Sequence, residues 1–382
     1  MSLLSSIKIR VVSNKTDWKT FYELPFKFYS HDPFWVPPLK MEERNLLNSR
    51  RNPFFNHTSI RAWLAFDRSE VVGRILAFVD DNYNDFHKSK MGFFGYFESI
   101  DSQNASNALI DHASDWLIDQ GMASIRGPIN LSVTNECGFL VNGFSSLPFI
   151  KMGHSLPYYP NLVENYGFEL EHRLLAYLIT NETVNSSELW RRLEKINERA
   201  LKNNEVQIRS INMDRYKEEV GHVFRIYNEF MKDNWGFVPA TKAEMYFMAD
   251  ILKFIIDPKM VLMAEYRGEI VGCSLGVPNI NQLLPELKGK LFPFGFIKLF
   301  LKRKKISNFR LMLIGVLPEF RERGFDVLLY YETIRRSLDR GYESAELSWI
   351  SEENKNLRSI LEKLGARLYK MYHVYEKNLM PD

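Results

Sequence analysis

The chain of 382 residues has few cysteines, no long apolar run and almost no charge imbalance. Its two cysteines, Cys137 and Cys273, lie far apart and give neither a disulfide framework nor the spacing of metal ligands. We therefore expect a reducing compartment and no bound metal. No stretch approaches the roughly 18 apolar residues of a membrane span, and the N-terminus lacks the pattern of a signal peptide. These absences predict a soluble, cytoplasmic protein.

The formal net charge of +3 gives no electrostatic reason to expect a nucleic-acid partner. The chain is instead rich in core-forming residues, because 45% of its residues are hydrophobic and 14% are aromatic. A chain of this length usually forms two domains.

Short motifs recur in the two halves of the chain in the same order. Arg68-Ser-Glu-Val-Val-Gly73 and Arg267-Gly-Glu-Ile-Val-Gly272 lie 199 positions apart, and each joins two apolar strands through a tight turn. Each copy continues into a further strand and a long helix that ends at a glycine, Gly121 or Gly341. The repeat predicts an α+β fold with mixed α/β sheets in two homologous domains. We place these domains at residues 1–185 and 206–382, joined by a connecting helix at 186–205.

The stretch from Ile314 to Asp326 predicts an anion site. It reads as a strand that ends at Pro318, a turn from Arg321 to Gly324 and the start of a long helix. Backbone N–H groups converge at a helix N-terminus and the helix dipole adds partial positive charge, so the phosphates of a nucleotide-like cofactor are the natural ligand. Asp326 fits less well, because its carboxylate can repel a pyrophosphate. In the first turn of a helix, however, a carboxylate is favourable without any ligand.

Residues 206–378 resemble the GNAT superfamily of acyl-CoA N-acyltransferases. The family pattern V-x-P-x-(F/Y)-(R/Q)-x-x-G-x-(G/A) is matched by Val316-x-Pro318-x-Phe320-Arg321-x-x-Gly324-x-Asp326, and a second match places Gly365 after Asn354 at the family's spacing. The resemblance implies two tandem GNAT-like domains, of which the first is degenerate. It also implies an N-acyltransferase, in the commonest case an N-acetyltransferase. The donor would be acetyl-CoA or another acyl-CoA, and the acceptor an amine of a small molecule or a peptide.

The resemblance further implies direct transfer from a bound cofactor. The pyrophosphate would lie on the loop after Pro318, and the thioester carbonyl against the preceding strand, which splays from its neighbour. Asn354 would lie beside the pantetheine arm. The implied cofactor-binding residues are Ile314, Gly315, Val316, Arg321, Glu322, Arg323, Gly324, Phe325, Asp326 and Asn354.

The catalytic residues depart from the family pattern. Leu361 stands where the family usually has the tyrosine that protonates the CoA thiolate, and leucine has no proton to give. Polar residues of the last strand are the substitutes that we consider for catalysis: Tyr369, Tyr372 and His373. The strand before the loop contains no carboxylate that could act as the base. A base acting through water, such as Glu265 or Glu346, is one alternative. The other is that both residues are surface carboxylates.

In the first copy, the equivalent junction at Phe97–Ala105 contains neither glycine nor arginine, so we expect no phosphate cradle there. Residues 122–160 instead combine polar and turn-forming residues, a pattern of shaped loops that often bind ligands. A long structured connector is the alternative. Trp235 lies in an aromatic loop of the second copy that commonly borders the acceptor site in the family. The candidate substrate-binding residues are Asn130, Asn135, Glu136, Tyr158, Tyr159 and Trp235.

The segment Phe292–Lys305 is apolar and then basic. It fits a membrane-surface helix, a lid over the acyl site or an inserted helix with a solvated end. One short segment does not outweigh the near-neutral balance of the chain, so we expect no membrane contact.

Two other functions stay open. Asp326 and Leu361 favour a non-catalytic acyl-CoA-binding or interaction protein. A two-domain transferase that uses aminoacyl-tRNA is the other, although the charge gives it little support. The sequence predicts neither the acceptor, the acyl length nor the oligomeric state.

Overall fold

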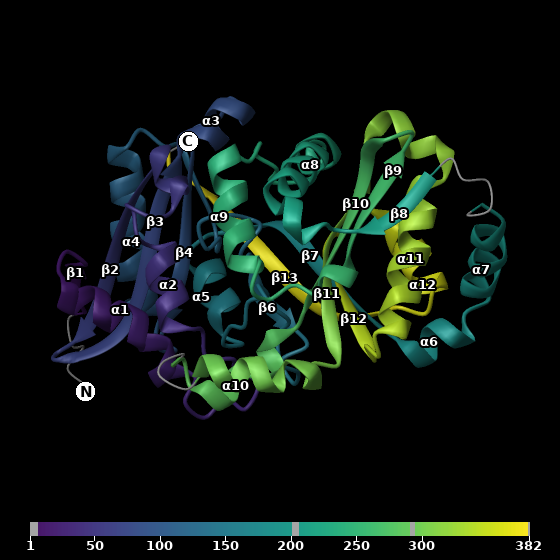
Figure 1. Cartoon of the computed structure of the whole chain (residues 1–382). Helices are drawn as coiled ribbons and strands as arrows, with labels where there is room; N and C mark the ends of the chain where they lie inside the picture. The colour runs from purple at the N-terminus through teal and green to yellow at the C-terminus, as the bar shows by residue number, and fades with distance from the viewer. Residues whose placement is uncertain (1–6, 201–205, 291–294, 381–382) are drawn as a thin grey trace. The chain divides into compact units, whose positions relative to one another are not determined.

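The computed structural model describes residues 7–200, 206–290 and 295–380, and it is divided into two compact units (Figure 1). Unit 1 comprises Met1–Leu174, Leu284–Leu291 and Lys370–Asp382. Unit 2 comprises Leu175–Leu283 and Phe292–Tyr369. Strands β7 (Glu169–Thr180) and β13 (Arg367–Asn378) therefore contribute residues to both units.

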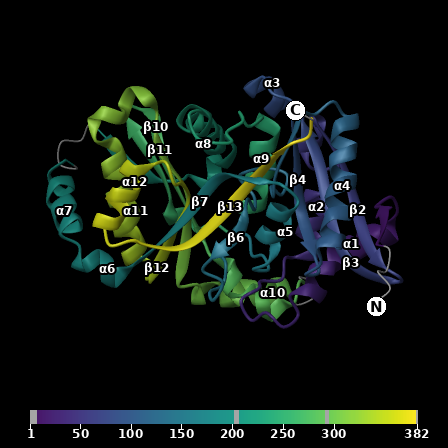
Figure 2. The same ribbon diagram turned by 180° about the vertical axis from the view of Figure 1, so that it is seen from behind.

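Unit 1 is a mixed sheet in the order β1-β2-β3-β4-β5-β13, and β6 lies beside β13 (Figure 2). All neighbouring strands are antiparallel except β4 and β5, which are parallel. The strands are β1 (Lys8–Val11), β2 (Thr58–Asp67), β3 (Glu70–Asp80), β4 (Met91–Ser99), β5 (Ser124–Gly127) and β6 (Phe139–Asn142). The α-helices are α1 (Lys15–Phe28), α2 (Lys40–Leu46), α3 (Asp81–His87), α4 (Gln103–Asp119) and α5 (Tyr159–Asn165), with a 3-10 helix at Pro53–Asn56.

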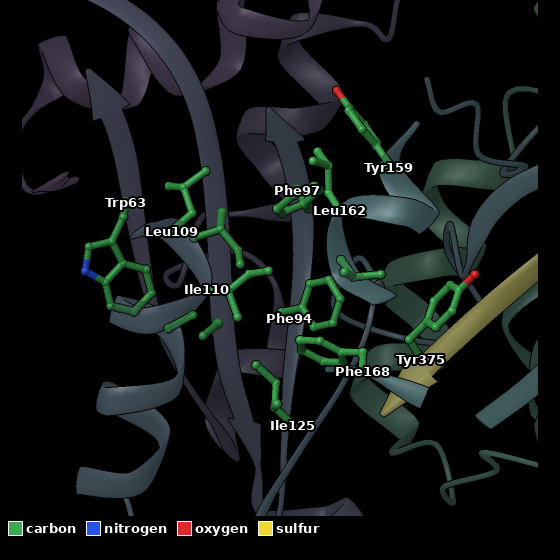
Figure 3. Close-up of a cluster of buried hydrophobic side chains, with 14 of the residues drawn as sticks. Trp63, Phe94, Phe97, Leu109, Ile110, Ile125, Tyr159, Leu162, Phe168 and Tyr375 are labelled. Atoms are coloured by element: carbon green, nitrogen blue, oxygen red, sulfur yellow. The ribbon is translucent and has the colours of Figure 1, made fainter. Parts of the chain in front are cut away.

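The main core of unit 1 lies between its sheet and the helices α4 and α5 (Figure 3). Leu109 and Ile110 of α4 and Leu162 of α5 pack there with Trp63 of β2 and Phe94 of β4. These apolar positions of α4 recur at helical spacing, so a single face of the helix is buried. The helix ends before Gly121, whose φ of +80° is the left-handed conformation that the sequence predicts for this glycine.

The strands of unit 2 lie in the order β7-β12-β11-β10-β9-β8; β11 and β12 are parallel, and the pairs β11–β10, β10–β9 and β9–β8 are antiparallel. Its strands are β8 (Val206–Ser210), β9 (Val261–Tyr266), β10 (Glu269–Pro278), β11 (Asn308–Val316) and β12 (Ser344–Ser351). Its α-helices are α6 (Asn181–Ser186), α7 (Glu188–Ala200), α8 (Tyr216–Met231), α9 (Lys242–Leu252), α10 (Gly295–Lys302), α11 (Phe325–Asp339) and α12 (Lys355–Lys363).

Helices cover both faces of the sheet in unit 2. Ile226 of α8 packs with Leu313 on one face, and Leu329 of α11 packs with Val316 on the other. Successive side chains of a strand point to opposite faces, so β11 reaches both cores. In the inserted segment, α10 places Ile297 and Leu301 in solvent, and residues 291–294 lie outside the described residues.

The backbone repeats in detail between the two units, which confirms the predicted duplication. Arg68 and Arg267, 199 positions apart, both adopt left-handed backbone angles, with φ of 54° and 50° in the β2–β3 and β9–β10 turns. The pairing register shifts at equivalent places, so that Val72 and Val271 are each the extra residue of a β-bulge.

Candidate active site

Strands β11 and β12 separate within unit 2. Their parallel ladder runs from Asn308–Ser344 to Leu311–Leu347 and ends there, although β11 continues to Val316 and β12 to Ser351. Directly after the ladder, Met312 is an extra residue in the pairing of β11 with β10, a bulge that bends the strand. The resemblance predicts a splayed strand at this place, and carboxyl ends of parallel strands are where ligands bind in such sheets.

The predicted anion loop follows β11 directly. Residues Pro318–Arg323 form a 3-10 helix, η8, and Gly324 has a φ of +75° before α11 begins at Phe325. An added Cβ at Gly324 would meet no described atom within 4 Å, so the backbone angle, and not crowding, requires the glycine. No described side chain caps the first turn of α11. Its N–H groups and dipole therefore offer an anion site.

Two arginines of the loop stack on aromatic rings. The Arg321 guanidinium lies 5.5 Å from the ring centre of Phe230, and the Arg323 guanidinium 5.5 Å from that of Tyr266. Both side chains are exposed, and stacking limits their freedom without neutralising their charge. Asp326 occupies the first turn of α11, where burial and then its carboxylate raise the pKa of Tyr330 to about 12.

The other predicted cofactor residues have structural partners. Gly315 faces α8, because an added Cβ would lie 2.5 Å from the ring of Phe230. Ile314 and Val316 pack on the opposite face with α11. Asn354 caps α12, since its Oδ1 accepts a hydrogen bond of 3.1 Å from the backbone N–H of Leu357. Nothing is described of the Glu322 side chain.

A buried polar network lies where the β11–β12 ladder ends. Arg310 of β11 and Glu346 of β12 face each other in register, and their Nε and Oε1 atoms are 3.7 Å apart. Ser348 Oγ donates to Glu346 Oε1 at 2.6 Å and accepts from Arg310 Nε at 2.9 Å. The hydroxyl of Tyr369 donates to the other oxygen, Glu346 Oε2. Two residues suggested by the sequence as candidate acid and base are thus in direct contact.

The remaining candidates for catalysis lie elsewhere. Tyr372 is buried in unit 1, where its hydroxyl donates to the carbonyl of Gly153 at 3.2 Å. His373 Nδ1 lies 3.3 Å from the hydroxyl of Tyr375. Glu265 pairs with Arg209 at 2.9 Å in unit 2. Leu361 is buried and lines an apolar cavity of about 40 Å³ with neighbours that include Tyr330 and Leu347.

In unit 1 the corresponding strand pair is filled by the chain itself. The parallel ladder of β4 and β5 ends at Phe93–Arg126, and β4 bulges near Tyr96. The residues after β5 then enter the gap: the Ile129 N–H donates to the Phe94 carbonyl at 2.8 Å, and the Tyr96 N–H donates to Asn130 Oδ1 at 2.7 Å. This half has the strand arrangement but no room along β4 for a ligand backbone.

Unit 1 nevertheless brings several substrate candidates together around carboxylates. Asn130 Nδ2 donates to Glu136 Oε2 at 2.9 Å, and the Tyr159 hydroxyl donates to Glu98 Oε2 at 2.6 Å. Burial raises the pKa of both glutamates, and the Arg74 guanidinium, 3.3 Å from Glu98, opposes that rise. The side chain of Glu136 nevertheless keeps contact with solvent.

The other three substrate candidates are placed in loops and turns or at their ends. The Tyr158 hydroxyl donates to the carbonyl of Ser99 at 2.8 Å, Asn135 lies in a turn, and Trp235 is half-buried in the turn after α8. Sequence reasoning missed Glu98, Arg310 and Ser348. The detectable signal is a charged residue inside an apolar strand, as at Glu98 and Arg310, because a buried charge needs a partner and often marks a site.

Comparison with known proteins places the chain in a family. No family model matches it. It is 36% identical over 382 residues to the bacterial ceramide synthase of Caulobacter vibrioides, covering 98% of each chain. It is 35% identical over 377 residues to protein YghO of Escherichia coli, covering 97% of this chain and 95% of that protein. The chain belongs to the family of these two proteins.

Solved structures identify the fold of this family member. A tandem GNAT protein from the clavulanic acid biosynthesis pathway matches with a TM-score of 0.59 at 11% identity, over 98% of this chain and 99% of that one. A GCN5-related N-acetyltransferase from Sphaerobacter thermophilus matches with a TM-score of 0.55 at 13% identity, over 100% and 98%. The predicted tandem GNAT fold is confirmed.

The described residues contain neither a membrane-spanning helix nor a metal-binding cluster. Across residues 7–200, 206–290 and 295–380, no helix is long and apolar enough to cross a membrane. The same residues hold no group of three or more histidine, cysteine or acidic side chains arranged to bind a metal ion.

Proposed function

We propose that this protein is an acyl-CoA-dependent N-acyltransferase that joins a fatty acyl group to the amine of a long-chain amino alcohol. The observation that carries the proposal is the end of the β11–β12 ladder at Leu311–Leu347, directly before the Gly324 turn and the uncapped start of α11. A splayed strand pair beside a helix N-terminus can hold a thioester and a pyrophosphate at the same time.

We place the pyrophosphate, the thioester and the pantetheine arm of acyl-CoA in unit 2. The pyrophosphate would take hydrogen bonds from backbone N–H groups between Arg321 and Asp326, with charge supplied by Arg321 and Arg323. The thioester would lie along Ile314–Val316, with the pantetheine arm toward Asn354. The cavity beside Leu361 is apolar, but at about 40 Å³ it is far smaller than a fatty acyl chain.

The acceptor class rests on the relative from Caulobacter vibrioides. A ceramide is the amide of a fatty acid and a long-chain amino alcohol, so a ceramide synthase of this fold acts on a lipid amine. Identity of 36% over nearly the whole chain supports the same reaction class here. The prediction that Asn130, Glu136 and Tyr159 contact the acceptor stays a prediction, as does a cytoplasmic location.

The test measures product formation by the purified full-length protein. Acetyl-, octanoyl- and palmitoyl-CoA are each combined with sphinganine, a simple alkylamine, a polyamine and a lysine peptide. We expect thiol release and an amide detected by mass spectrometry with palmitoyl-CoA and sphinganine.

The other outcomes decide between the alternatives. Transfer of acetyl groups to the polyamine or the peptide would replace the lipid acceptor with a soluble amine. Binding of acyl-CoA in calorimetry without thiol release from any pair would favour the non-catalytic alternative. Lack of any acyl-CoA binding would refute the proposal.

A further inference from the structure

Glu346 is fully buried, yet it is connected to the surface of unit 2 by a tyrosine. Its relative exposure is 0%, and those of its neighbours Arg310 and Ser348 are 3% and 5%. Tyr369, which donates a hydrogen bond to Glu346 Oε2, is only half-buried. Among Arg310, Glu346, Ser348 and Tyr369, only Tyr369 is partly exposed. A proton can therefore reach the Glu346 carboxylate through the Tyr369 hydroxyl.

The network around Glu346 gives the buried carboxylate charged and hydrogen-bonding partners. A lone buried carboxylate is strongly unfavourable, but here the Arg310 guanidinium lies 3.7 Å from Oε1 and the Ser348 hydroxyl donates to the same oxygen at 2.6 Å. Arg310 also donates to the Ser348 carbonyl at 3.3 Å, which ties the guanidinium to β12. The second carboxylate oxygen accepts a hydrogen bond from Tyr369.

The position of the network connects it to the reaction. Arg310 and Glu346 form the last register pair but one of the β11–β12 ladder, so they lie at the apex of the splayed strands. The proposed thioester site on β11 begins three residues beyond Leu311. Leu361, by contrast, is buried and apolar, so it can neither give nor take a proton.

We infer that Tyr369 and Glu346 form the proton-transfer pair of the acyl transfer, with Tyr369 as the catalytic residue and Glu346 as its internal proton store. This inference rests on the proposed function. Arg310 and Ser348 are positioning residues, because they act on the substrate only through Glu346.

The transfer balances without a further reactant. The neutral amine attacks the thioester carbon and forms a C–N bond, and the positively charged nitrogen gives a proton to the Tyr369 oxygen as the tyrosine passes its own proton to Glu346 Oε2. The C–S bond then breaks, and sulfur leaves with the electron pair as a thiolate. The same path in reverse returns one proton to the sulfur. Glu346 ends ionised, and CoA leaves as a free thiol.

The test is Tyr369→Phe, which removes one hydroxyl from a half-buried position. We expect kcat to fall by about 100- to 1,000-fold, the usual contribution of general acid–base groups, while the Kd of CoA changes by less than about twofold. Glu346→Gln should lower kcat by a similar factor, and both variants should lose the acidic limb of the pH profile of kcat/KM.

The chain offers a matched control in the same unit. The hydroxyl of Tyr177 donates to Glu362 Oε1 at 3.0 Å and accepts from Arg358 Nε at 3.2 Å, so, like Tyr369, it is a tyrosine that donates to a glutamate. Tyr177 is fully buried, so its variant also controls for loss of packing, and we expect folded Tyr177→Phe to leave kcat and its pH profile unchanged.

The outcomes separate this inference from the proposed function. If the wild type is active and Tyr369→Phe keeps the same pH profile and a kcat within about threefold of the wild type, the inferred proton pair is wrong and the proposed function stands. A wild type that transfers no acyl group to any acceptor overturns both. A CoA Kd that rises as much as kcat falls assigns Tyr369 to binding and also contradicts the inference.

Discussion

The two parallel strand pairs of this chain start alike and end differently. Both the β4–β5 and the β11–β12 ladder stop after a few residues beside a bulge. In unit 1, Ile129 and Asn130 then bond to the backbone of β4. In unit 2, the equivalent segment after β12 leads into α12 at Lys355, and the chain after β11 forms the Gly324 turn. Hydrogen-bonding groups left open by a splay must be satisfied. In unit 1 the chain itself satisfies them, and in unit 2 the proposed thioester would do so along Ile314–Val316.

In the β4–β5 strand pair of unit 1, we expect the largest loss of stability from a substitution at Gly95. A Cβ added there would lie 2.1 Å from the carbonyl oxygen of Ile129, so Gly95→Ala must move backbone. We expect a loss of about 3 kcal/mol or more in the free energy of unfolding, the upper end for overpacking. Chemical unfolding and hydrogen exchange of the β4 amides measure it.

Gly121→Ala is the control for Gly95→Ala. Gly121 has a φ of +80° but no atom within 4 Å of an added Cβ, so only backbone strain of about 1 kcal/mol is expected. Equal losses in the two variants would contradict the close packing of Ile129 on β4.

In unit 2, the proposed CoA site depends on the backbone conformation of Gly324. Gly324 and Gly341 lie at the two ends of α11, both with a φ of +75° and both with open space around an added Cβ. Alanine should therefore strain both sites equally, by about 1–2 kcal/mol. Only Gly324→Ala should raise the Kd of CoA, by about tenfold, because only that turn orients N–H groups toward a phosphate.

Calorimetry with CoA on both variants distinguishes these outcomes. A tenfold rise for Gly341→Ala as well would show that general destabilisation, and not the loop, controls binding.

The sequence predicted the features that depend on local pattern. The Arg68 and Arg267 turns, the strands on either side and the helix ends at Gly121 and Gly341 follow from spacing and turn chemistry, and the structure contains each of them. Those signals are local, because a strand or a helix cap is specified by a few neighbouring residues.

The contacts that distinguish the two units depend on distant residues. Asn130 bonds to Tyr96 across 34 positions, and Arg310 bonds to Ser348 across 38. Nothing in the neighbourhood of Asn130 indicates that its side chain satisfies a strand N–H. The contact of Tyr369 with Glu346 likewise depends on where β13 lies relative to β12, which no local pattern of the sequence specifies.

The protonation of Glu43 should make the stability of unit 1 depend on pH. Burial, and then the carboxylate of Glu136, raise the pKa of Glu43 from 4.5 to about 7. The folded state therefore holds this proton more tightly than the unfolded chain. The resulting stabilisation is fully present below about pH 4.5 and is lost as the pH rises through about 7.

Glu43→Gln should remove this pH dependence. Because part of Glu43 stays exposed, we expect the variant to gain only about 1 kcal/mol over the wild type at pH 8, and almost nothing at pH 5. Thermal unfolding at the two pH values measures the difference. Glu169→Gln, at an exposed position, serves as the control. An equal gain of Glu43→Gln at both pH values would refute the assignment of the pH dependence to Glu43.

The smallest effect concerns Asp326, the residue of the loop that departs from the family pattern. Its carboxylate lies in the first turn of α11, where it interacts favourably with the helix dipole but adds negative charge near the proposed pyrophosphate site. Asp326→Asn keeps the size of the side chain and removes the charge. We expect CoA to bind about threefold more tightly at low salt, with a smaller gain at high salt because ions screen the repulsion. The control is Asp339→Asn, which removes an equal charge from the last turn of the same helix. Tighter binding in both variants would attribute the gain to net charge, and no change in Asp326→Asn would mean that the carboxylate points away from the phosphates and is no obstacle to the cofactor.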